Sequence, residues 1–466
     1  MASRYDAIVI GAGQAGPSLA NRLAASGMKV AFVERDKFGG TCVNTGCTPT
    51  KAMVASAYAA HLARRGGEYG VHVAGPISVD MKKVKARKDA IVADSANGLE
   101  SWLRTNPNIT VLHGHARFES SSEVSVDGDR LTASKIFINV GGRAVVPDMP
   151  GVDQITYLNN SSMMAVDFLP RHLIIVGGSY IGLEFGQMFR RFGSEVTIVE
   201  MAPRLIKRED EDISEAVRQI LEKEGVRIRL NAKCIAFRID GTNTAVRVDC
   251  RDGAQEEIGS HVLLAVGRRP NTDDLSLEKA GVATDKFGYI VVDEQLRTNV
   301  PGIWALGDCN GRGAFTHTSY NDYEIVAANL LDNDPRRVSD RITTYGLFID
   351  PPLGRAGMTE AEALASGRKV LVGKRPMTRV ARAIEKGETQ GFMKILVDAD
   401  SQEILGAAVL GPGGDEAVHC VLDVMCAKKP YSVIQRAVHI HPTVAELIPT
   451  ILGELKPLEP TRARVA

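Results

Sequence analysis

Two cysteines, Cys42 and Cys47, stand five positions apart in the segment Cys-Val-Asn-Thr-Gly-Cys. Side chains five apart do not share one face of a regular helix, but they can bridge if Cys42 lies in the preceding loop and Cys47 opens the helix. Gly46 loosens the loop, and Pro49 suits a first helical turn. A helix dipole stabilises a thiolate at its N-terminus and makes it reactive. The pattern predicts a redox-active disulfide, with two inert thiols as the alternative.

A candidate base lies near the C-terminal end, where His441 is followed by Pro442 and then by Glu446. Pro442 favours an extended backbone at His441, and Glu446 can fix the ring tautomer and raise its basicity. A thiol–disulfide enzyme needs a base with a pKa near neutrality to move the proton of the attacking and leaving thiols, and imidazole fits. A lone histidine is more often structural, which is how we interpret the nearby His439.

The elements that must position these groups begin with a glycine loop. The apolar run Ala7–Ile10 has the character of a strand buried on both faces, and Gly11, Gly13 and Gly16 follow it. We expect a helix over residues 17–26 and a second strand that ends at Glu34. The glycines allow the backbone to approach a pyrophosphate at the helix N-terminus, and Glu34 can accept hydrogen bonds from a ribose.

The same plan recurs in the middle of the chain. An apolar run over residues 173–176 precedes Gly177 and Gly182, and Glu200 closes the next strand. In both copies the acidic residue lies 23 positions after the first glycine. Two loops with equal spacing and matching flanks predict two dinucleotide-binding βαβ units, although Ser179 replaces the middle glycine in the second copy.

Composition excludes several classes of protein. The 466 residues contain 56 Lys and Arg and 56 Asp and Glu, so we expect neither a nucleic-acid nor a membrane partner. No apolar segment suits a membrane span or a signal peptide, and we expect a cytoplasmic protein. In that compartment the seven cysteines are expected to be unbridged outside the active pair, and no metal site is predicted. The scattered cysteines are interpreted as small buried hydrophobes: Cys234, Cys250, Cys309, Cys420 and Cys426.

Three motifs together resemble the pyridine nucleotide–disulfide oxidoreductases of the glutathione reductase, dihydrolipoamide dehydrogenase and mercuric reductase group. Residues 39–51 resemble the active-site signature of that family, residues 302–308 its second FAD motif, and residues 441–446 its C-terminal base motif. The resemblance runs from about residue 5 to about residue 455.

The resemblance implies an α/β fold with two Rossmann-like dinucleotide-binding domains, for FAD and NAD(P)H, and a C-terminal α+β dimerisation domain. Residues 1–150 and 272–343 would form the two parts of the FAD-binding domain. Residues 151–271 would bind NAD(P)H, and residues 344–466 would form a homodimer.

Roles for individual residues also follow from the resemblance. Cys47 would be the thiol nearest the flavin, and Cys42 the interchange thiol that attacks the substrate. Lys51 and Glu184 would form an ion pair beside the flavin N5. Further contacts to FAD are implied for Gly11, Gly13, Gly16, Glu34, Gly40, Thr41, Lys51, Ala116, Gly141, Asp308 (at the ribityl chain) and Thr316, of which Ala116 and Thr316 would act through backbone atoms. Contacts to the nicotinamide dinucleotide are implied for Gly177, Gly182, Glu200 and Gly267.

The homodimer matters for the chemistry that the resemblance implies. The base motif of one subunit would complete the site of the other, so that His441 and Glu446 act in trans and a monomer is inactive. The expected reaction carries hydride from the nicotinamide to FAD, electrons from FAD to the Cys42–Cys47 disulfide, and then to a small disulfide substrate.

The electron donor and acceptor stay open. Glu200 favours NADH because a carboxylate accepts from the ribose 2′-OH and repels a 2′-phosphate, whereas Arg204, Lys207 and Arg208 could instead bind that phosphate of NADPH. Residues 459–466 hold no cysteine pair and His441 is present, which disfavours a dedicated mercuric reductase. The alternatives are a dihydrolipoamide dehydrogenase, a metal-ion or quinone reductase with the same thiols, and a flavin-binding sensor without thiol catalysis.

Overall fold

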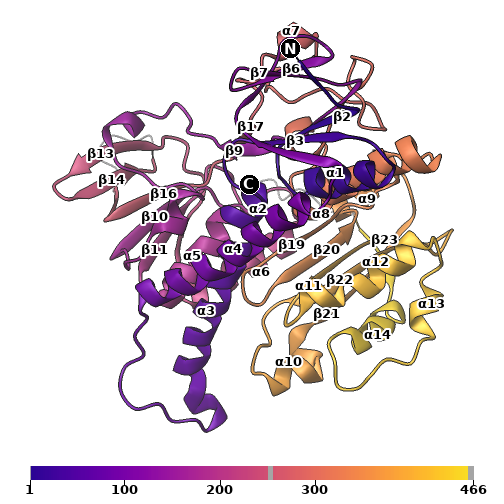
Figure 1. Ribbon diagram of the computed structural model, residues 1–466. Helices are drawn as coiled ribbons and strands as arrows, with labels where there is room; N and C mark the ends of the chain where they lie inside the picture. The colour runs from indigo at the N-terminus through magenta and orange to yellow at the C-terminus, as the bar shows by residue number, and fades with distance from the viewer. Residues whose placement is uncertain (1, 250–255, 460–466) are drawn as a thin grey trace.

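A computed structural model describes residues 2–249 and 256–459 of the chain. The first glycine loop belongs to a five-stranded parallel sheet in the order β18-β8-β2-β3-β4. Figure 1 labels two of its strands, β2 and β3. The central strand β2 is buried along its whole length, as a strand covered on both faces requires. The strands are β2 (Ala7–Ile10), β3 (Val30–Glu34), β4 (Ile109–His113), β8 (Lys135–Ile138) and β18 (Ile303–Ala305).

Two helices pack side by side on this sheet, α1 (Ala15–Ala25) and α8 (Thr316–Ala327). The predicted start of α1 at residue 17 is wrong, because the glycine loop already adopts the helical turn at Ala15. A smaller four-stranded sheet, in the order β1-β7-β6-β5, lies at the same end of the molecule. Its strands are β1 (Ser3–Arg4), β5 (Ala116–Phe118), β6 (Glu123–Val126) and β7 (Asp129–Thr132), and the short helix α7 (Leu277–Ala280) contacts β5.

The second glycine loop lies in a four-stranded parallel sheet in the order β12-β11-β10-β16. Its strands are β10 (His172–Val176), β11 (Glu195–Val199), β12 (Arg227–Arg229) and β16 (His261–Leu264), and its helices are α5 (Tyr180–Phe192) and α6 (Glu211–Lys223). Helix α5 starts within the glycine motif, at Tyr180. Four apolar residues of α6 are buried in the core: Ile213, Val217, Ile220 and Leu221. An antiparallel sheet of β13 (Ala236–Asp240), β14 (Asn243–Arg247) and β15 (Glu257–Gly259) flanks the unit.

The C-terminal part forms a six-stranded antiparallel sheet in the order β19-β20-β23-β22-β21-β24. The strands are β19 (Thr344–Leu347), β20 (Leu353–Gly357), β21 (Val370–Pro376), β22 (Phe392–Asp398), β23 (Ile404–Leu410) and β24 (Lys456–Pro457). The helices are α9 (Glu360–Ala365), α10 (Ala381–Glu385), α11 (Gly414–Ala417), α12 (His419–Cys426), α13 (Ser432–Gln435) and α14 (Ile448–Leu452). The sheet of this part is thus antiparallel, whereas the two glycine loops lie in parallel sheets.

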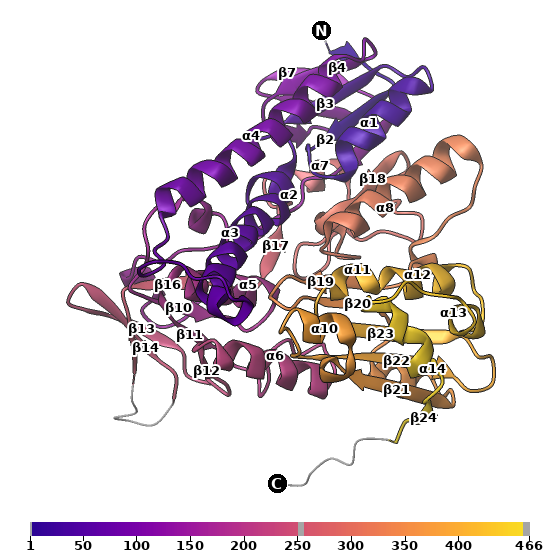
Figure 2. The same cartoon turned by 90° about the horizontal axis from the view of Figure 1, so that it is seen from below.

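The cysteine segment links the two glycine-loop units. It forms a short helix, α2 (Gly40–Asn44), and then the long helix α3 (Cys47–Arg65), which packs against α4 (Met81–Arg104) and α5 (Figure 2). Because α5 follows the second glycine loop, α3 brings the cysteines of the first unit against a helix of the second.

A two-stranded ribbon joins the same two units. The chain leaves the first unit through β9 (Gly142–Ala144) and returns to it through β17 (Arg268–Pro270), and the two strands pair antiparallel. These are the two segments whose sequences resemble each other after β8 and β16.

Among the helices of the described ranges, none combines the length and the apolar character needed to cross a membrane.

Candidate active site

The first glycine loop packs its backbone tightly. Gly11 has a φ of +103°, and a Cβ there would lie 2.3 Å from the carbonyl oxygen of Asn139. A Cβ on Gly16 would lie 2.3 Å from the carbonyl oxygen of Gly11. Both positions therefore require glycine. At the end of β3, the Glu34 carboxylate accepts a hydrogen bond from the backbone N–H of Ala12 at 2.6 Å, which holds it beside the loop.

The second glycine loop repeats this geometry. A Cβ on Gly182 would lie 2.0 Å from the carbonyl oxygen of Gly177. The Glu200 carboxylate accepts hydrogen bonds from the N–H groups of Gly178 at 2.6 Å and Ala202 at 2.8 Å. The equal spacing of the two motifs thus corresponds to equal backbone contacts.

A cavity of about 990 Å³ runs from the first glycine loop to the cysteine pair. This volume lies at the upper end of the roughly 300–1,000 Å³ typical of small-molecule sites, so it can hold a dinucleotide. It is lined by thirteen of the predicted residues: Gly11, Gly13, Glu34, Gly40, Thr41, Cys42, Cys47, Lys51, Ala116, Gly141, Glu184, Asp308 and Thr316. Outside its lining are Gly16, which packs beneath the loop, and Gly177, Gly182, Glu200 and Gly267, which belong to the second unit.

The lining of the cavity fits FAD. The glycine loop offers backbone N–H groups at the start of α1 for a pyrophosphate, and Glu34 offers a carboxylate for a ribose. Asp308 offers a carboxylate for hydroxyl groups, and burial raises its pKa. The cation nearest to Asp308 is Arg268, whose Nε lies 3.8 Å from Oδ2.

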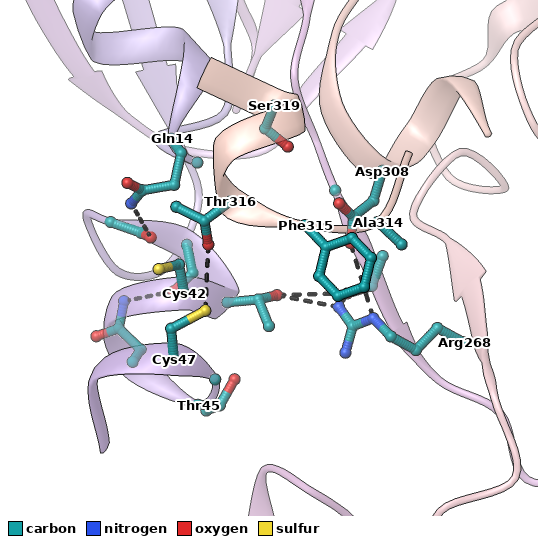
Figure 3. Close-up of a pocket in the computed structure, with 18 of the residues that line it drawn as sticks. Gln14, Cys42, Thr45, Cys47, Arg268, Asp308, Ala314, Phe315, Thr316 and Ser319 are labelled. Atoms are coloured by element: carbon teal, nitrogen blue, oxygen red, sulfur yellow. Dashed lines mark hydrogen bonds and ion pairs between the residues drawn. The ribbon is translucent and has the colours of Figure 1, made fainter. Parts of the chain in front are cut away.

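The cysteine pair lines this cavity together with Thr316, Phe315 and Asp308 (Figure 3). Cys47 is the first residue of α3, as predicted, but Cys42 lies in the short helix α2 and not in a loop. The correction follows from Gly39 and Gly40, whose positive φ values allow one helical turn to form before the chain reverses into α3. The Cys47 sulfur is exposed to the cavity and lies 3.1 Å from the hydroxyl of Thr316.

The pKa values of the two thiols are shifted in opposite directions. The pKa of Cys47 is lowered to about 6 by a hydrogen bond from Cys42, with smaller contributions from the Thr316 hydroxyl and the Lys51 ammonium group. The pKa of Cys42 is raised well above its usual range by that same hydrogen bond and by burial. In the reduced pair, Cys47 therefore carries the negative charge and Cys42 carries the proton.

A buried ion pair stands one helical turn into α3. The Lys51 ammonium lies 2.8 Å from Glu184 Oε2, and Glu184 is almost wholly buried on α5. Glu184 Oε1 also accepts the backbone N–H of Phe348 at 3.0 Å, and Lys51 lies 4.3 Å from the centre of the Phe348 ring. These contacts connect three parts of the chain: the helix α3 that begins at Cys47, the helix α5, and the residue that follows β19.

Two lining residues were missed by the sequence analysis. Arg268 donates to the Gly142 carbonyl and, at 3.2 Å, to the Thr41 hydroxyl. Tyr180 lies one helical turn before Glu184 on α5 and lines the cavity, and burial raises its pKa to about 12. The i, i+4 spacing to Glu184 was a signal that could have identified Tyr180, whereas nothing local marks Arg268.

The basic residues after Glu200 have other partners. The Arg208 guanidinium lies over the Tyr180 ring, 5.0 Å from its centre. Arg204 donates to the Lys207 carbonyl at 3.1 Å.

The candidate base lies apart from the cavity of its own chain. His441 Nδ1 is 2.9 Å from Glu446 Oε2, and the His441 side chain is 75% exposed. The neighbouring Val438 and Ile440 are 100% and 80% exposed. An apolar strip next to an exposed histidine marks a surface for protein association.

The scattered cysteines depart from the expectation in part. Cys309 is buried, as predicted, and Cys420 is half-buried. Cys426 is exposed, so its prediction as a buried hydrophobe is wrong; it ends the short helix α12 at the surface. Cys234 is half-buried and disulfide-bonded, which corrects the expectation of an unbridged thiol. Cys250 lies outside the described residues.

Comparison with protein families gives two matches that cover most of the chain. Residues 5–322 match the model of the pyridine nucleotide-disulphide oxidoreductases. Residues 343–451 match the model of the dimerisation domain of the same group.

Relatives with several names match nearly the whole chain. The probable pyridine nucleotide-disulfide oxidoreductase RclA of Escherichia coli is 37% identical, with 97% of this chain and 100% of RclA covered. A dihydrolipoyl dehydrogenase of Thermus scotoductus is 32% identical, with 95% of each chain covered. A mercuric reductase of Streptomyces lividans is 32% identical, with 95% of this chain and 94% of the relative covered.

A solved structure has the same fold. The Cu(II) complex of the HOCl-induced flavoprotein disulfide reductase RclA from Escherichia coli superposes with a TM-score of 0.89 at 35% identity, covering 97% of this chain and 100% of the other.

Proposed function

This chain belongs to the pyridine nucleotide-disulphide oxidoreductase family, and from that premise we propose that it carries electrons from NADH through FAD to Cys42 and Cys47 and then to a small disulfide. The enzyme is a flavoprotein disulfide reductase that uses FAD and a pyridine nucleotide, and its C-terminal domain forms a homodimer. The observation that carries the proposal is the gathering of the cysteine pair, the Lys51–Glu184 ion pair and Asp308 around one cavity.

The residues of the cavity have distinct tasks in this proposal. Bound FAD would supply a two-electron carrier between the nicotinamide and the disulfide. Glu34 and the first glycine loop would hold its adenosine and pyrophosphate groups, Asp308 would bind its ribityl hydroxyl groups, and Lys51 would supply a positive charge that favours hydride transfer. Two electrons and one proton then convert the Cys42–Cys47 disulfide into the Cys42 thiol and the Cys47 thiolate.

Cys42 acts as the nucleophile toward the substrate. Once deprotonated, its sulfur bonds to one substrate sulfur while the substrate S–S bond breaks. Cys47 then attacks the Cys42 sulfur, which re-forms the internal disulfide and releases the second substrate sulfur as a thiolate. We assign the proton transfers to His441 of the partner subunit, oriented by Glu446, because an exposed His–Glu pair beside an apolar strip fits a site completed by a second copy.

Two observations support NADH as the donor. The Glu200 carboxylate is fixed at the end of β11 by two backbone N–H groups, where a 2′-phosphate would meet its charge. Arg208, one of the three basic residues that could bind that phosphate, lies over the Tyr180 ring.

Residues 1–150 and 272–343 are proposed as the two parts of the FAD-binding domain, residues 151–271 as the NADH-binding domain, and residues 344–466 as the dimerisation domain. We also propose a cytoplasmic location, where the active thiols would stay reducible.

Anaerobic addition of one equivalent of NADH to the FAD-loaded enzyme tests the proposal. We expect a long-wavelength absorbance from the Cys47 thiolate beside the oxidised flavin. The Cys42→Ser variant should keep a thiolate absorbance even without NADH, and Cys47→Ser should lose it. Bleaching of the flavin without this absorbance in the wild type would contradict the proposal. Oxidised lipoamide, oxidised glutathione and other small disulfides would then be compared as acceptors.

A second candidate function is reduction of a metal ion at the same thiols. It is favoured by the low pKa of the exposed Cys47 and by the Cu(II) complex known for the similar RclA protein. Metal-ion reduction releases no thiolate that needs a proton. Turnover with Cu(II) should therefore survive His441→Ala, whereas turnover with a disulfide should not.

A further inference from the structure

The Arg382 guanidinium holds the backbone beside the candidate base His441. Its Nε and Nη2 atoms lie 3.1 and 2.6 Å from the carbonyl oxygen of Pro442, the residue that follows His441. Arg382 belongs to α10 and lies 60 positions before Pro442. A planar guanidinium keeps its N–H groups in a fixed fork. Two bonds from that fork to one carbonyl therefore fix the peptide group in direction as well as in distance.

Local bonds orient the His441 ring but do not place it on the domain. The Glu446 carboxylate lies 2.9 Å from His441 Nδ1 and belongs to the same short stretch of chain. The His441 side chain is 75% exposed, so packing within one chain does little to hold it. Val444 is buried in the core and anchors the stretch two residues after Pro442. The Arg382 contact anchors it at Pro442 itself, next to the ring.

Helix α10 gives this contact a firm support. Val380 and Ala383, which flank Arg382 in the sequence, are fully buried in the core of the C-terminal domain. Three residues after α10, Glu388 accepts a hydrogen bond at 2.8 Å from the hydroxyl of Tyr58 on α3. Arg382 therefore extends from a helix that is packed and tethered, as a side chain that positions a functional group requires.

We infer that Arg382 is a positioning residue for the base: by holding the Pro442 carbonyl, it aims the His441 imidazole at the cysteine pair of the partner subunit. The inference rests on the proposed function, since it takes His441 as the group that carries protons in disulfide exchange. There the imidazole accepts the proton of the Cys42 thiol as the Cys42 sulfur bonds to the substrate, and returns it to the leaving thiolate. Hydride from NADH brings two electrons and the proton together, so reduction of the cysteine pair needs no base.

The test separates these two halves of the reaction in the FAD-loaded dimer. In stopped flow, reduction by NADH is followed as the long-wavelength absorbance appears. Reoxidation by oxidised lipoamide or oxidised glutathione is followed as it disappears. Arg382→Met keeps the stem of the side chain and removes both donors. We expect reoxidation to slow about tenfold, because a base that loses its aim gives up part of a contribution of about 10²–10⁴-fold, while reduction keeps its wild-type rate.

The leaving group supplies a readout that a merely structural role of Arg382 would not change. Dithiobis(nitrobenzoic acid) releases a thiol of much lower pKa than lipoamide or glutathione, and a thiol of low pKa leaves readily as the thiolate. We expect Arg382→Met to slow reoxidation by this probe about threefold or less. His441→Ala should show the same order of losses, with larger values.

Glu385→Gln is the matched control. Glu385 lies 3.5 Å from Arg382 on the same helix, and its side chain is 49% exposed. Its loss removes an ion pair of Arg382 but leaves the bonds to Pro442, so both halves of the reaction should keep their rates. If Arg382→Met does not form a dimer in size-exclusion chromatography, Arg382→Lys takes its place. That variant keeps the charge but not the fork, and its reoxidation should slow about threefold.

Three results would overturn the inference: reoxidation at the wild-type rate in the Arg382 variant, an equal slowing of its reduction by NADH, or an equal slowing of reoxidation in Glu385→Gln. Wild-type reoxidation in His441→Ala would instead refute the role of His441 in the proposed function, so the two failures are distinguishable.

Discussion

Cys42 and Cys47 are neighbours with opposite electrostatic surroundings, and this difference reaches beyond reactivity to stability. The folded state lowers the pKa of Cys47 to about 6 and raises the pKa of Cys42. In an unfolded chain both thiols return to an ordinary pKa of about 8.5. Between about pH 6 and 8.5 the unfolded chain therefore binds more protons at Cys47 than the folded chain does.

We predict that the reduced enzyme gains stability as pH rises from about 6 to 8.5 and loses stability above this window, because Cys42 then ionises in the unfolded chain while it stays protonated in the folded chain. Urea midpoints of the reduced protein across pH 5.5 to 9 measure the effect. Reduced Cys47→Ser should show a smaller gain over the same window. An equal slope in both proteins would contradict the assignment of the low pKa to Cys47.

We predict that Glu200 sets the preference for NADH over NADPH. Glu200→Gln removes the charge but keeps an acceptor, so we expect the ratio of kcat/KM for NADH over NADPH to fall about tenfold, which corresponds to about 1.4 kcal/mol. The control is Glu195→Gln, which changes a carboxylate at the opposite end of β11 that is largely exposed. If both variants shift the ratio equally, net charge and not a specific contact sets the preference.

The residues of a local motif could be predicted from the sequence, whereas contacts between distant segments could not. Cys47 at a helix start and Glu34 beside a glycine loop follow from spacing, and the structure has both. The Thr316 hydroxyl at Cys47 and the Arg268 guanidinium at Thr41 join residues more than 200 positions apart. No periodicity or propensity encodes such a contact, because it depends on how separate elements pack.

At the scale of elements, the glycine loops allow strand and helix to pack closely because no side chain stands between them. Gly182→Ala would place a Cβ 2.0 Å from the Gly177 carbonyl and force α5 away from β10. Such overpacking costs about 1–3 kcal/mol, and we expect it to raise KM for NADH about tenfold because the loop binds the dinucleotide.

Gly98→Ala is the control for a glycine without such a contact. Gly98 is exposed within α4, and a Cβ there meets nothing within 4 Å. Alanine should stabilise the protein by about 0.5–1 kcal/mol through helix propensity, with KM for NADH unchanged. Thermal midpoints and steady-state kinetics on both variants check the pair. An unchanged KM in Gly182→Ala would show that the second loop tolerates a side chain.

The elements themselves were predictable where the pattern was long and apolar. The strands before both glycine loops agree with their predicted bounds to within one residue. Helix α1 starts two residues earlier than predicted, because the glycine and proline of its first turn have poor helix propensity and yet suit that turn geometrically. Helix α2 was missed because one turn of five residues has no periodicity to detect.

At the scale of the whole molecule, a buried ion cluster fastens the second glycine-loop unit to the C-terminal sheet. The ammonium of Lys394 on β22 lies 2.8 Å from carboxylate oxygens of Asp210 and Asp212 at the start of α6 and of Glu360 at the start of α9. Although burial alone would raise it, the pKa of Asp210 is lowered by Arg355 and Lys394. Lys394 likewise lowers the pKa of Asp212 against the effect of burial, and the two aspartates raise the pKa of Lys394.

We predict that Lys394→Met destabilises the protein by about 3 kcal/mol, because it removes one of the two cations that face buried Asp210 and the cation that faces Glu360. Lys374→Met is the control. Lys374 also lies 2.8 Å from Asp212, but its side chain is 45% exposed, so its loss should cost about 1 kcal/mol or less. Urea unfolding of the oxidised dimer distinguishes the two. Equal losses would indicate that the buried position of Lys394 is unimportant.

The proposed sharing of His441 between subunits has a direct test in mixed dimers. Cys47→Ser and His441→Ala homodimers should each be inactive toward a disulfide. A mixed dimer has one site with both defects and one site with none, so it should recover about half of the wild-type activity per dimer. No recovery after subunit exchange would place His441 in the site of its own chain.

The paired strands β9 and β17 and the Lys394 cluster both attach the second glycine-loop unit to the rest of the molecule. The second unit is attached along one edge by this ribbon and along another by the ions. We expect the ribbon to act as a hinge and the ions to restrain rotation of the second unit about it. Without the ions the second unit would swing more freely, and domain motion, in place of chemistry, would then limit the rate.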